Sequence, residues 1–139
     1  MIAGFCTMMI TTKGRYALRV MVDLAQQRLC EFVTLKDIAE RQQISEKYLE
    51  SIISSFSKAG YVTAVRGKGG GYKLSRIPSE YTVGSILRLV EGSLAPVACV
   101  VGDTVNCDRS GECKTLPLWQ GLDKVIDDYL ESKTLADLL

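Results

Sequence analysis

The sequence has 139 residues, of which 47% are hydrophobic and 24% charged; this suits one globular domain or a small domain with an appendage, and no apolar run reaches the ~18–20 residues of a membrane span. It contains no histidine, which excludes Ser/His and Cys/His catalytic sites and histidine-containing metal sites. No other pattern supplies a general base, a nucleotide-binding loop or a second cofactor site, so we expect no enzyme. The net charge of +1 is unevenly distributed. Residues 1–78 contain 12 basic and 6 acidic residues, whereas residues 79–139 contain 5 basic and 10 acidic residues. The basic first part favours a polyanionic partner.

The first helix is expected over residues 11–30, where the apolar residues Tyr16, Val20 and Leu24 recur on one side. A short second helix is expected to follow Thr34, the N-cap of a capping-box pattern.

A third helix is expected from its N-cap Ser45 to about Ala59, with Gly60 as its C-terminal stop. One of its faces is apolar and the other carries small polar and charged side chains. A tight turn at residues 42–44 joins it to the second helix. Two short helices joined in this way are typical of a helix-turn-helix motif that binds DNA, although a plain helical hairpin in a core fits the same residues.

Two strand-like runs at residues 61–65 and 72–75 predict a β-hairpin whose loop is Arg66-Gly67-Lys68-Gly69-Gly70-Gly71. The loop lacks the residue order of a nucleotide-binding loop, and a strand follows it where such a loop would precede a helix. A basic hairpin directly after a helix-turn-helix is typical of the wing of a winged helix, where Arg66 and Lys68 can reach phosphates or the minor groove. An ordinary flexible hairpin is the alternative.

The remaining residues predict a short helix from about Tyr81 to Val90, a long loop over 93–115 and a helix over about 116–132 with Thr115 as its N-cap. Four apolar side chains repeat along one side of that last long helix: Leu118, Leu122, Val125 and Tyr129. This stripe is wide for a helix on a small domain, so it favours antiparallel pairing with a second copy, although packing on the chain's own first helix also fits. A short helix capped by Thr134 is expected to end the chain.

Five cysteines without a secretory signal argue against a disulfide scaffold and favour reduced thiols in a cytoplasmic protein. Cys99, Cys107 and Cys113 lie in the long loop, separated by seven and five residues. Thiolates are soft ligands that suit iron–sulfur clusters and zinc, and these gaps are wider than those of structural zinc sites. Metal ligation is therefore favoured, with incidental or redox-active thiols as the alternative. Cys30, near the end of the first helix, is expected to be structural, and the sequence indicates no role for Cys6.

Several short motifs of the sequence occur together as a pattern. They are Thr11-Thr12-Lys13-Gly14-Arg15-Tyr16-Ala17-Leu18, Ile44-Ser45, Tyr48-Leu49-Glu50, Val65-Arg66-Gly67, Gly69-Gly70-Gly71-Tyr72, the three loop cysteines, Leu118-Trp119 and Thr134-Leu135. Over residues 9–139 this pattern resembles the IscR-like family of bacterial winged-helix regulators, which includes IscR, NsrR and CymR.

The resemblance implies a mostly α fold, a winged helix-turn-helix with a small β-hairpin wing and a long C-terminal dimerisation helix. It implies a DNA-binding domain at 9–78, a connecting helix and cysteine-containing sensor loop at 79–115, and a dimerisation helix with a short terminal helix at 116–139. The implied partners are a double-stranded DNA operator and a second copy of the chain in a homodimer, with no membrane.

The resemblance also implies which residues contact DNA. They come from the start of the first helix, the third helix and the wing: Thr12, Lys13, Ser45, Lys47, Tyr48, Glu50, Ser51, Arg66, Gly67 and Lys68. Glu50 matches the glutamate that governs the accepted operator class in IscR. A carboxylate can accept a hydrogen bond from cytosine N4 and repels phosphate, so it can select between DNA sequences. Arg66 matches the wing arginine that reaches the minor groove, whereas Lys47 and Ser51 lie at contact positions but differ from IscR in residue type.

Cys99, Cys107 and Cys113 match the three cluster cysteines of the family, with a 2Fe-2S cluster favoured over 4Fe-4S. IscR takes its fourth ligand from a histidine where this sequence has Leu116, and NsrR-type proteins from an aspartate where it has Arg15. The fourth ligand is therefore unassigned, and the CymR subtype, which lacks the three cysteines, fits less well.

The resulting prediction is a transcriptional regulator that senses iron–sulfur status or redox or nitrosative stress through its cluster. Its rivals are a regulator with a metal-free thiol switch, a small iron–sulfur electron carrier and a winged helix that binds a protein partner.

Overall fold

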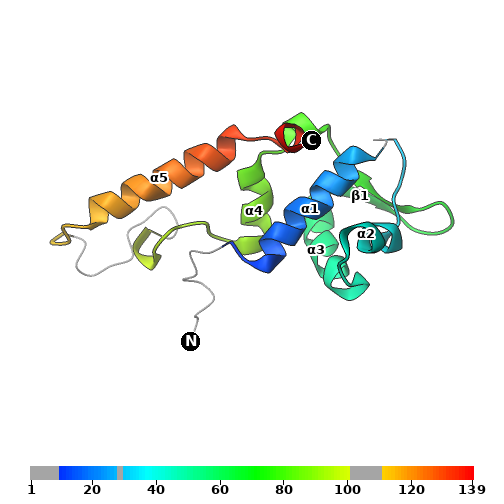
Figure 1. Cartoon of the computed structure of the whole chain (residues 1–139), viewed down its shortest axis with the longest axis horizontal. Helices are drawn as coiled ribbons and strands as arrows, with labels where there is room; N and C mark the ends of the chain where they lie inside the picture. Colours follow the sequence, from blue (N-terminus) through cyan, green and yellow to red (C-terminus); the bar gives the residue numbers. More distant parts are fainter. Residues whose placement is uncertain (1–9, 28–29, 101–110) are drawn as a thin grey trace.

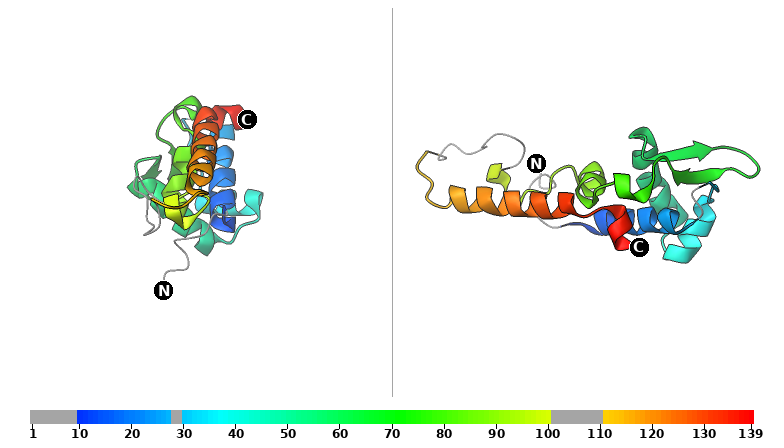
Figure 2. Two further views of the ribbon diagram at one scale, coloured as in Figure 1. Left: turned by 90° about the vertical axis from the view of Figure 1, so that its left-hand side faces the viewer. Right: turned by 90° about the horizontal axis from the view of Figure 1, so that it is seen from above.

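A computed structural model of the chain describes residues 10–27, 30–100 and 111–139. In chain order these form α1 (Thr12–Gln26), α2 (Leu35–Gln42), α3 (Glu46–Lys58), β1 (Val62–Val65), β2 (Gly71–Leu74), η2 (Pro78–Glu80), α4 (Val83–Glu91), η3 (Ala98–Val100), α5 (Leu116–Ser132) and η4 (Leu135–Leu138), where η marks a 3-10 helix. Helices α1 to α4 and the hairpin gather in one body, and α5 extends from it as a long arm while the hairpin projects from the opposite end (Figures 1 and 2). This is the mostly α winged-helix architecture that the sequence predicts. None of the helices in the described ranges is long and apolar enough to cross a bilayer.

Hydroxyl side chains begin most of the helices, as the sequence predicts for Thr34 and Ser45. Their oxygens accept from the backbone N–H three residues on: Thr11 from Gly14, Thr34 from Asp37, Ser45 from Tyr48 and Thr82 from Ser85. Each bond satisfies one of the N–H groups that the first turn of a helix leaves without a partner. Thr115 differs, because it precedes α5 without a side-chain cap bond and its Oγ1 lies 3.3 Å from Cys113 Sγ. Thr115 therefore holds the predicted N-cap position, and its carbonyl accepts from the N–H groups of Leu118 and Trp119, but its side chain does not cap the helix.

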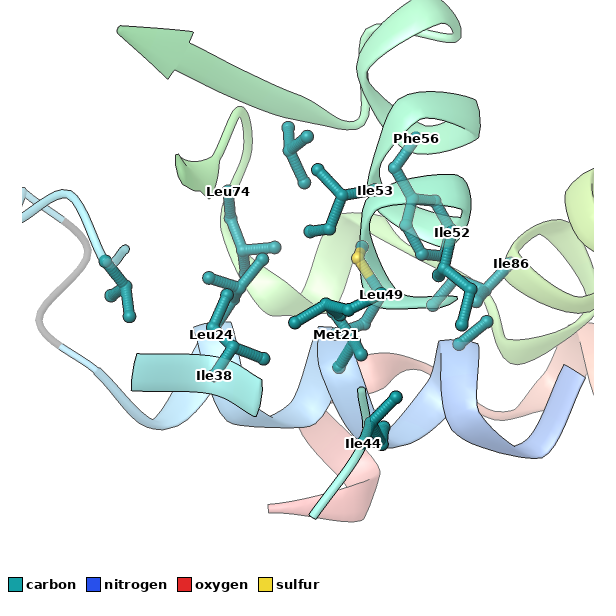
Figure 3. Packing of buried hydrophobic residues seen from close by; sticks show 14 of the residues in the cluster. Met21, Leu24, Ile38, Ile44, Leu49, Ile52, Ile53, Phe56, Leu74 and Ile86 are labelled. Atoms are coloured by element: carbon teal, nitrogen blue, oxygen red, sulfur yellow. The ribbon is translucent and has the colours of Figure 1, made fainter. Parts of the chain in front are cut away.

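One apolar core lies between α1, α2, α3, α4 and the hairpin (Figure 3). The predicted stripe of α1 is confirmed, since Val20 and Met21 are fully buried and Leu24 nearly so. Helix α3 contributes the four buried residues Leu49, Ile52, Ile53 and Phe56. The core therefore takes one face of each helix and leaves the other face of α3 outside.

Tyr81 is a buried polar link that the sequence does not reveal. Its hydroxyl donates to the Tyr61 carbonyl at 2.6 Å and accepts from the N–H groups of Ser75 and Arg76 at 3.1 Å each. These bonds satisfy a phenol that is 1% exposed, and they hold the base of the hairpin on the segment before α4.

Three details of the chain differ from expectation. Helix α1 ends at Gln26, short of the expected residue 30, because Gln27 is extended with φ −82° and ψ 169°. Cys30, expected to be structural, is exposed beyond that helix. The final helix η4 is a single 3-10 segment, begun by a reciprocal capping box between Thr134 and Asp137. That box confirms the expected start of the terminal helix.

Candidate nucleic-acid interface and thiol site

Helix α3 presents a polar side to solvent. Lys47, Glu50 and Ser51 are all exposed there, opposite the buried apolar side. Ser45 is exposed at the N-terminus, and because its oxygen accepts from the Tyr48 N–H at 3.2 Å, its own proton is left to donate to an acceptor such as phosphate. The face combines a cation, a carboxylate and hydroxyls, which is the chemistry that contacts phosphates and base edges.

Tyr48 has a different place from the other predicted contacts of α3. Its ring is half-buried and meets the ring of Tyr16 edge-on, with 5.7 Å between centroids and 61° between planes. The guanidinium of Arg19 lies 5.1 Å from the centroid of Tyr16. This contact packs the first turn of α3 on α1, so Tyr48 positions the helix as well as bordering its exposed face.

A buried carboxylate fixes α1 against α2 before the helix-turn-helix turn. Asp23 is 1% exposed and accepts from Arg41 Nε at 3.0 Å, Arg41 Nη2 at 2.7 Å and Gln42 Nε2 at 2.8 Å. These charge-assisted bonds offset the desolvation of the carboxylate. The hydrogen bond to Asp23 raises the pKa of Arg41, against a smaller opposing effect of burial. The sequence patterns did not identify Asp23 as a buried residue, and the one signal for it is its position beside the apolar stripe of α1.

The hairpin pairs β1 with β2 in antiparallel register, from Val62 opposite Leu74 to Val65 opposite Gly71. Each strand lies within one residue of its predicted position. Arg66, Gly67 and Lys68 are exposed in the connecting loop. Gly67 has φ +95°, a conformation that favours glycine, and the loop lies at the end of the molecule opposite α5 (Figure 2).

A third extended segment joins the hairpin. Val33 and Tyr72 exchange two backbone hydrogen bonds of 2.8 Å each. This approach requires Gly71, because a Cβ at that residue would lie 2.4 Å from the Val33 carbonyl oxygen and its φ is +145°. The bridge links the wing to the residues immediately before α2.

Gly71→Ala is expected to lower the free energy of unfolding by about 1–3 kcal/mol, because alanine is strained at this backbone angle and clashes with Val33. Urea unfolding measures the change. Gly111→Ala is the matched control, since nothing lies within 4 Å of its Cβ position, and its stability should change by no more than about 0.5 kcal/mol. Equal stability of the two variants would contradict a structural role for the bridge.

Cys99 and Cys113 pack on the same small apolar cluster, formed by Ala95, Val100 and Leu116. Both thiols are half-buried, and Cys113 Sγ lies 3.3 Å from Thr115 Oγ1. Cys107, the third predicted ligand, lies outside the described residues. Among those that the structure does describe, no three Cys, Asp or Glu side chains are grouped to hold a metal ion. Two soft donors that meet at one cluster nevertheless fit the expected thiolate set.

Leu116, the residue at which the family resemblance would place a histidine ligand, has a structural role instead. It is 9% exposed and packs with Ala95 and Val100. An apolar side chain in a small core cannot donate to a metal ion.

The predicted stripe on α5 is exposed. Leu118, Val125 and Tyr129 are each more than 60% exposed, and Leu122 is 38% exposed. The alternative that this stripe packs on the chain's own first helix is therefore wrong. Helix α5 is held to α4 on another side, where Arg88 Nη1 binds Glu131 Oε2 at 2.7 Å and Arg88 Nη2 binds Asp127.

Known proteins share both the sequence and the fold. Residues 10–139 match the Rrf2 family, described as iron-dependent transcriptional regulator. The chain is 39% identical to the HTH-type transcriptional regulator IscR of Vibrio atlanticus, over 95% of this chain and 75% of that protein. It is 40% identical to the protein rrf2 of Nitratidesulfovibrio vulgaris, over 95% and 87% of the two chains.

Solved structures of two regulators resemble most of the chain. T. potens IscR has a TM-score of 0.73 at 40% identity and covers 94% of this chain and 85% of its own. CymR, the global cysteine regulator of B. subtilis, has a TM-score of 0.75 at 38% identity and covers 94% of this chain and 95% of its own.

Proposed function

The chain belongs to the Rrf2 family of transcriptional regulators, and from that premise we propose that it binds a two-fold DNA operator as a homodimer and adjusts the binding through a cysteine-ligated iron–sulfur cluster. The observation that carries the proposal is the exposed polar side of α3 beside a projecting basic hairpin. In this proposal, residues 9–78 bind DNA, 79–115 sense and 116–139 dimerise.

The proposed DNA contacts divide by chemistry. Lys47, Ser45 and the start of α1 at Thr12 and Lys13 would bind phosphates, which fix register without reading sequence. Glu50 and Ser51 would face base edges in the major groove, with Glu50 selecting against acceptors. The remaining proposed contacts are Tyr48, beside the groove, and Arg66, Gly67 and Lys68 in the wing. Several phosphate contacts make the affinity fall steeply with salt.

The proposed dimer uses the exposed stripe of α5. Four large apolar side chains along one helix face are more than a monomer normally leaves in water, and a second α5 offers the same stripe in antiparallel pairing. A cavity of about 380 Å³ lies beside this stripe, with Val125 and Tyr129 on its wall and Ile10 and Leu94 opposite. Both features favour an apolar partner along the arm.

The proposed sensor consists of Cys99, Cys107 and Cys113, with a 2Fe-2S cluster favoured. When bound, such a cluster supplies a centre that reacts with oxidants and nitric oxide. The two described thiols lie on either side of the loop: Cys99 is in η3, and Cys113 is close to the start of α5. The order of the loop between them would therefore bias the position of α5, and with it the separation of the two α3 helices.

Anaerobic reconstitution with iron and sulfide tests the sensor. The wild-type chain is expected to hold about two iron and two sulfide ions per chain, and Cys99→Ser and Cys113→Ser to lose most of both, because a harder hydroxyl replaces a thiolate ligand. Chemical iron and sulfide assays measure the content. Cys30→Ser is the control, since Cys30 is exposed and outside the loop, and it should keep the full content.

Two results would contradict the cluster. Zinc in place of iron and sulfide would identify a different metal site. A metal-free wild type whose loop thiols change mass on oxidation would identify the thiol switch instead.

A further inference from the structure

The first turn of α1 is tied to the last residue of α4. The Thr11 N–H donates to Glu91 Oε2 at 2.5 Å, and the Thr11 hydroxyl donates to Glu91 Oε1 at 2.8 Å. Gly14 makes room for this contact, because a Cβ there would fall 2.6 Å from Glu91 Oε2. One carboxylate thus uses both oxygens on a segment 80 residues away in sequence.

The contact is also electrostatically favourable. The N-terminus of a helix carries a partial positive charge, and a carboxylate at that end is stabilised by it. Hydrogen bonds to an ionised acceptor are about twice as strong as neutral ones. Glu91 therefore holds α1 by two directional bonds and by the dipole of the helix.

From Glu91, a series of contacts leads to the proposed DNA-binding face. Tyr16, in the next turn of α1, meets the ring of Tyr48 in the first turn of α3 at 5.7 Å. Displacing the start of α1 therefore displaces the packing surface of α3. Lys13 moves with it, since it lies in the same turn as Gly14.

Contacts in the other direction lead to the sensor and the arm. Glu91 ends α4, and the chain turns at Gly92, with φ +83°, toward Cys99. Arg88, one turn earlier in α4, binds Asp127 and Glu131 of α5. Helix α4 lies between α1 and α5 in Figure 1, and its last turn bonds to Thr11 on one side and to α5 on the other.

We propose that Glu91 is a positioning residue for DNA binding: it sets the first turn of α1, and through Tyr16 the recognition helix α3, relative to the end of α4 where the cysteine loop departs. This inference rests on the proposed function, because Lys13 and α3 contact DNA only there. The proposal predicts a change in DNA affinity opposite to the one expected from charge alone. Removing an acidic residue normally strengthens the binding of a polyanion, whereas loss of the Glu91 contact should weaken it.

Glu91→Gln in the full-length dimer tests the proposal. The probe is a duplex that the wild-type protein selects from a random library, and fluorescence anisotropy over a salt series measures affinity. We expect roughly tenfold weaker binding, as for the loss of one charge-assisted hydrogen bond, and a smaller salt slope because a phosphate contact is lost. Lys13→Ala should have a similar effect alone and little further effect in the Glu91→Gln background.

Two further variants separate positioning from charge and from folding. Glu80→Gln removes the same charge from an exposed site in η2 and should leave affinity unchanged or slightly higher. Gly14→Ala keeps the Glu91 charge but displaces its carboxylate, and alanine favours the helix, so the protein should fold and bind about as weakly as Glu91→Gln.

The outcomes are distinct. Wild-type affinity in both Glu91→Gln and Gly14→Ala, or an undiminished additional effect of Lys13→Ala, overturns the positioning role alone. A wild-type protein that selects no duplex at all contradicts the proposed function, and the inference falls with it.

Discussion

Val125→Glu is expected to convert the dimer to monomers and to weaken operator binding by roughly 10²–10⁴-fold. Val125 is 65% exposed at the centre of the α5 stripe, between Leu122 and Tyr129. In the paired helices a carboxylate there would be buried without a partner, and its desolvation would outweigh the free energy gained from helix pairing. Without the second subunit, each chain binds only one half-site and loses the gain of simultaneous binding. Sedimentation velocity measures the oligomer, and anisotropy on the selected duplex measures affinity.

Gln120→Glu is the control for this change. Gln120 is exposed on the same helix but lies on the side away from the stripe, so it adds an equal charge outside the proposed interface. It should leave the dimer intact. A Val125→Glu protein that stays dimeric and binds as wild type would contradict the α5 interface.

Ser51→Glu is expected to weaken operator binding by about 100-fold or more. Ser51 is exposed on α3 next to Glu50, so a second carboxylate would stand against DNA phosphates and base acceptors. Like charges at an interface cost several kcal/mol, and about 2.7 kcal/mol already corresponds to a hundredfold change. Anisotropy with the same duplex measures the loss.

Ser79→Glu provides the comparison, since Ser79 is exposed in η2 and is outside the proposed contact set. Both serines are on the surface, so both variants should unfold at nearly the wild-type temperature. Equal DNA affinities of the two variants would contradict the proposed contact between α3 and DNA.

Local patterns explain what could be predicted. The stripe of α1 depends on helical spacing, and the caps Thr34 and Ser45 depend on bonds within three residues, so neither requires knowledge of the rest of the fold. The wing follows from its glycines and two short apolar runs. The exposed residues of α3 and α5 were identified for the same reason, because a helix with one buried face fixes what the other face presents.

The parts that could not be predicted depend on distant segments that meet. Asp23 has an ordinary place in the sequence of α1, and only the approach of Arg41 and Gln42 makes it a buried centre. The bond between Glu91 and Thr11 joins the end of α4 to the start of α1, 80 residues away in sequence. Thr115 shows a local limit: its residue type and Pro117 correctly indicate the N-cap position, but its hydroxyl lies near Cys113 and makes no cap bond.

Hydroxyl-radical footprinting with measured stoichiometry tests most directly whether two α3 helices read one operator. On the selected duplex we expect two protected half-sites related by a two-fold axis, with centres about 10–10.5 base pairs or a whole multiple apart, and two chains bound. Ser51→Glu should abolish both protected regions together. A single unsymmetrical protected stretch that holds one chain per duplex and persists in Ser51→Glu would contradict the dimeric regulator.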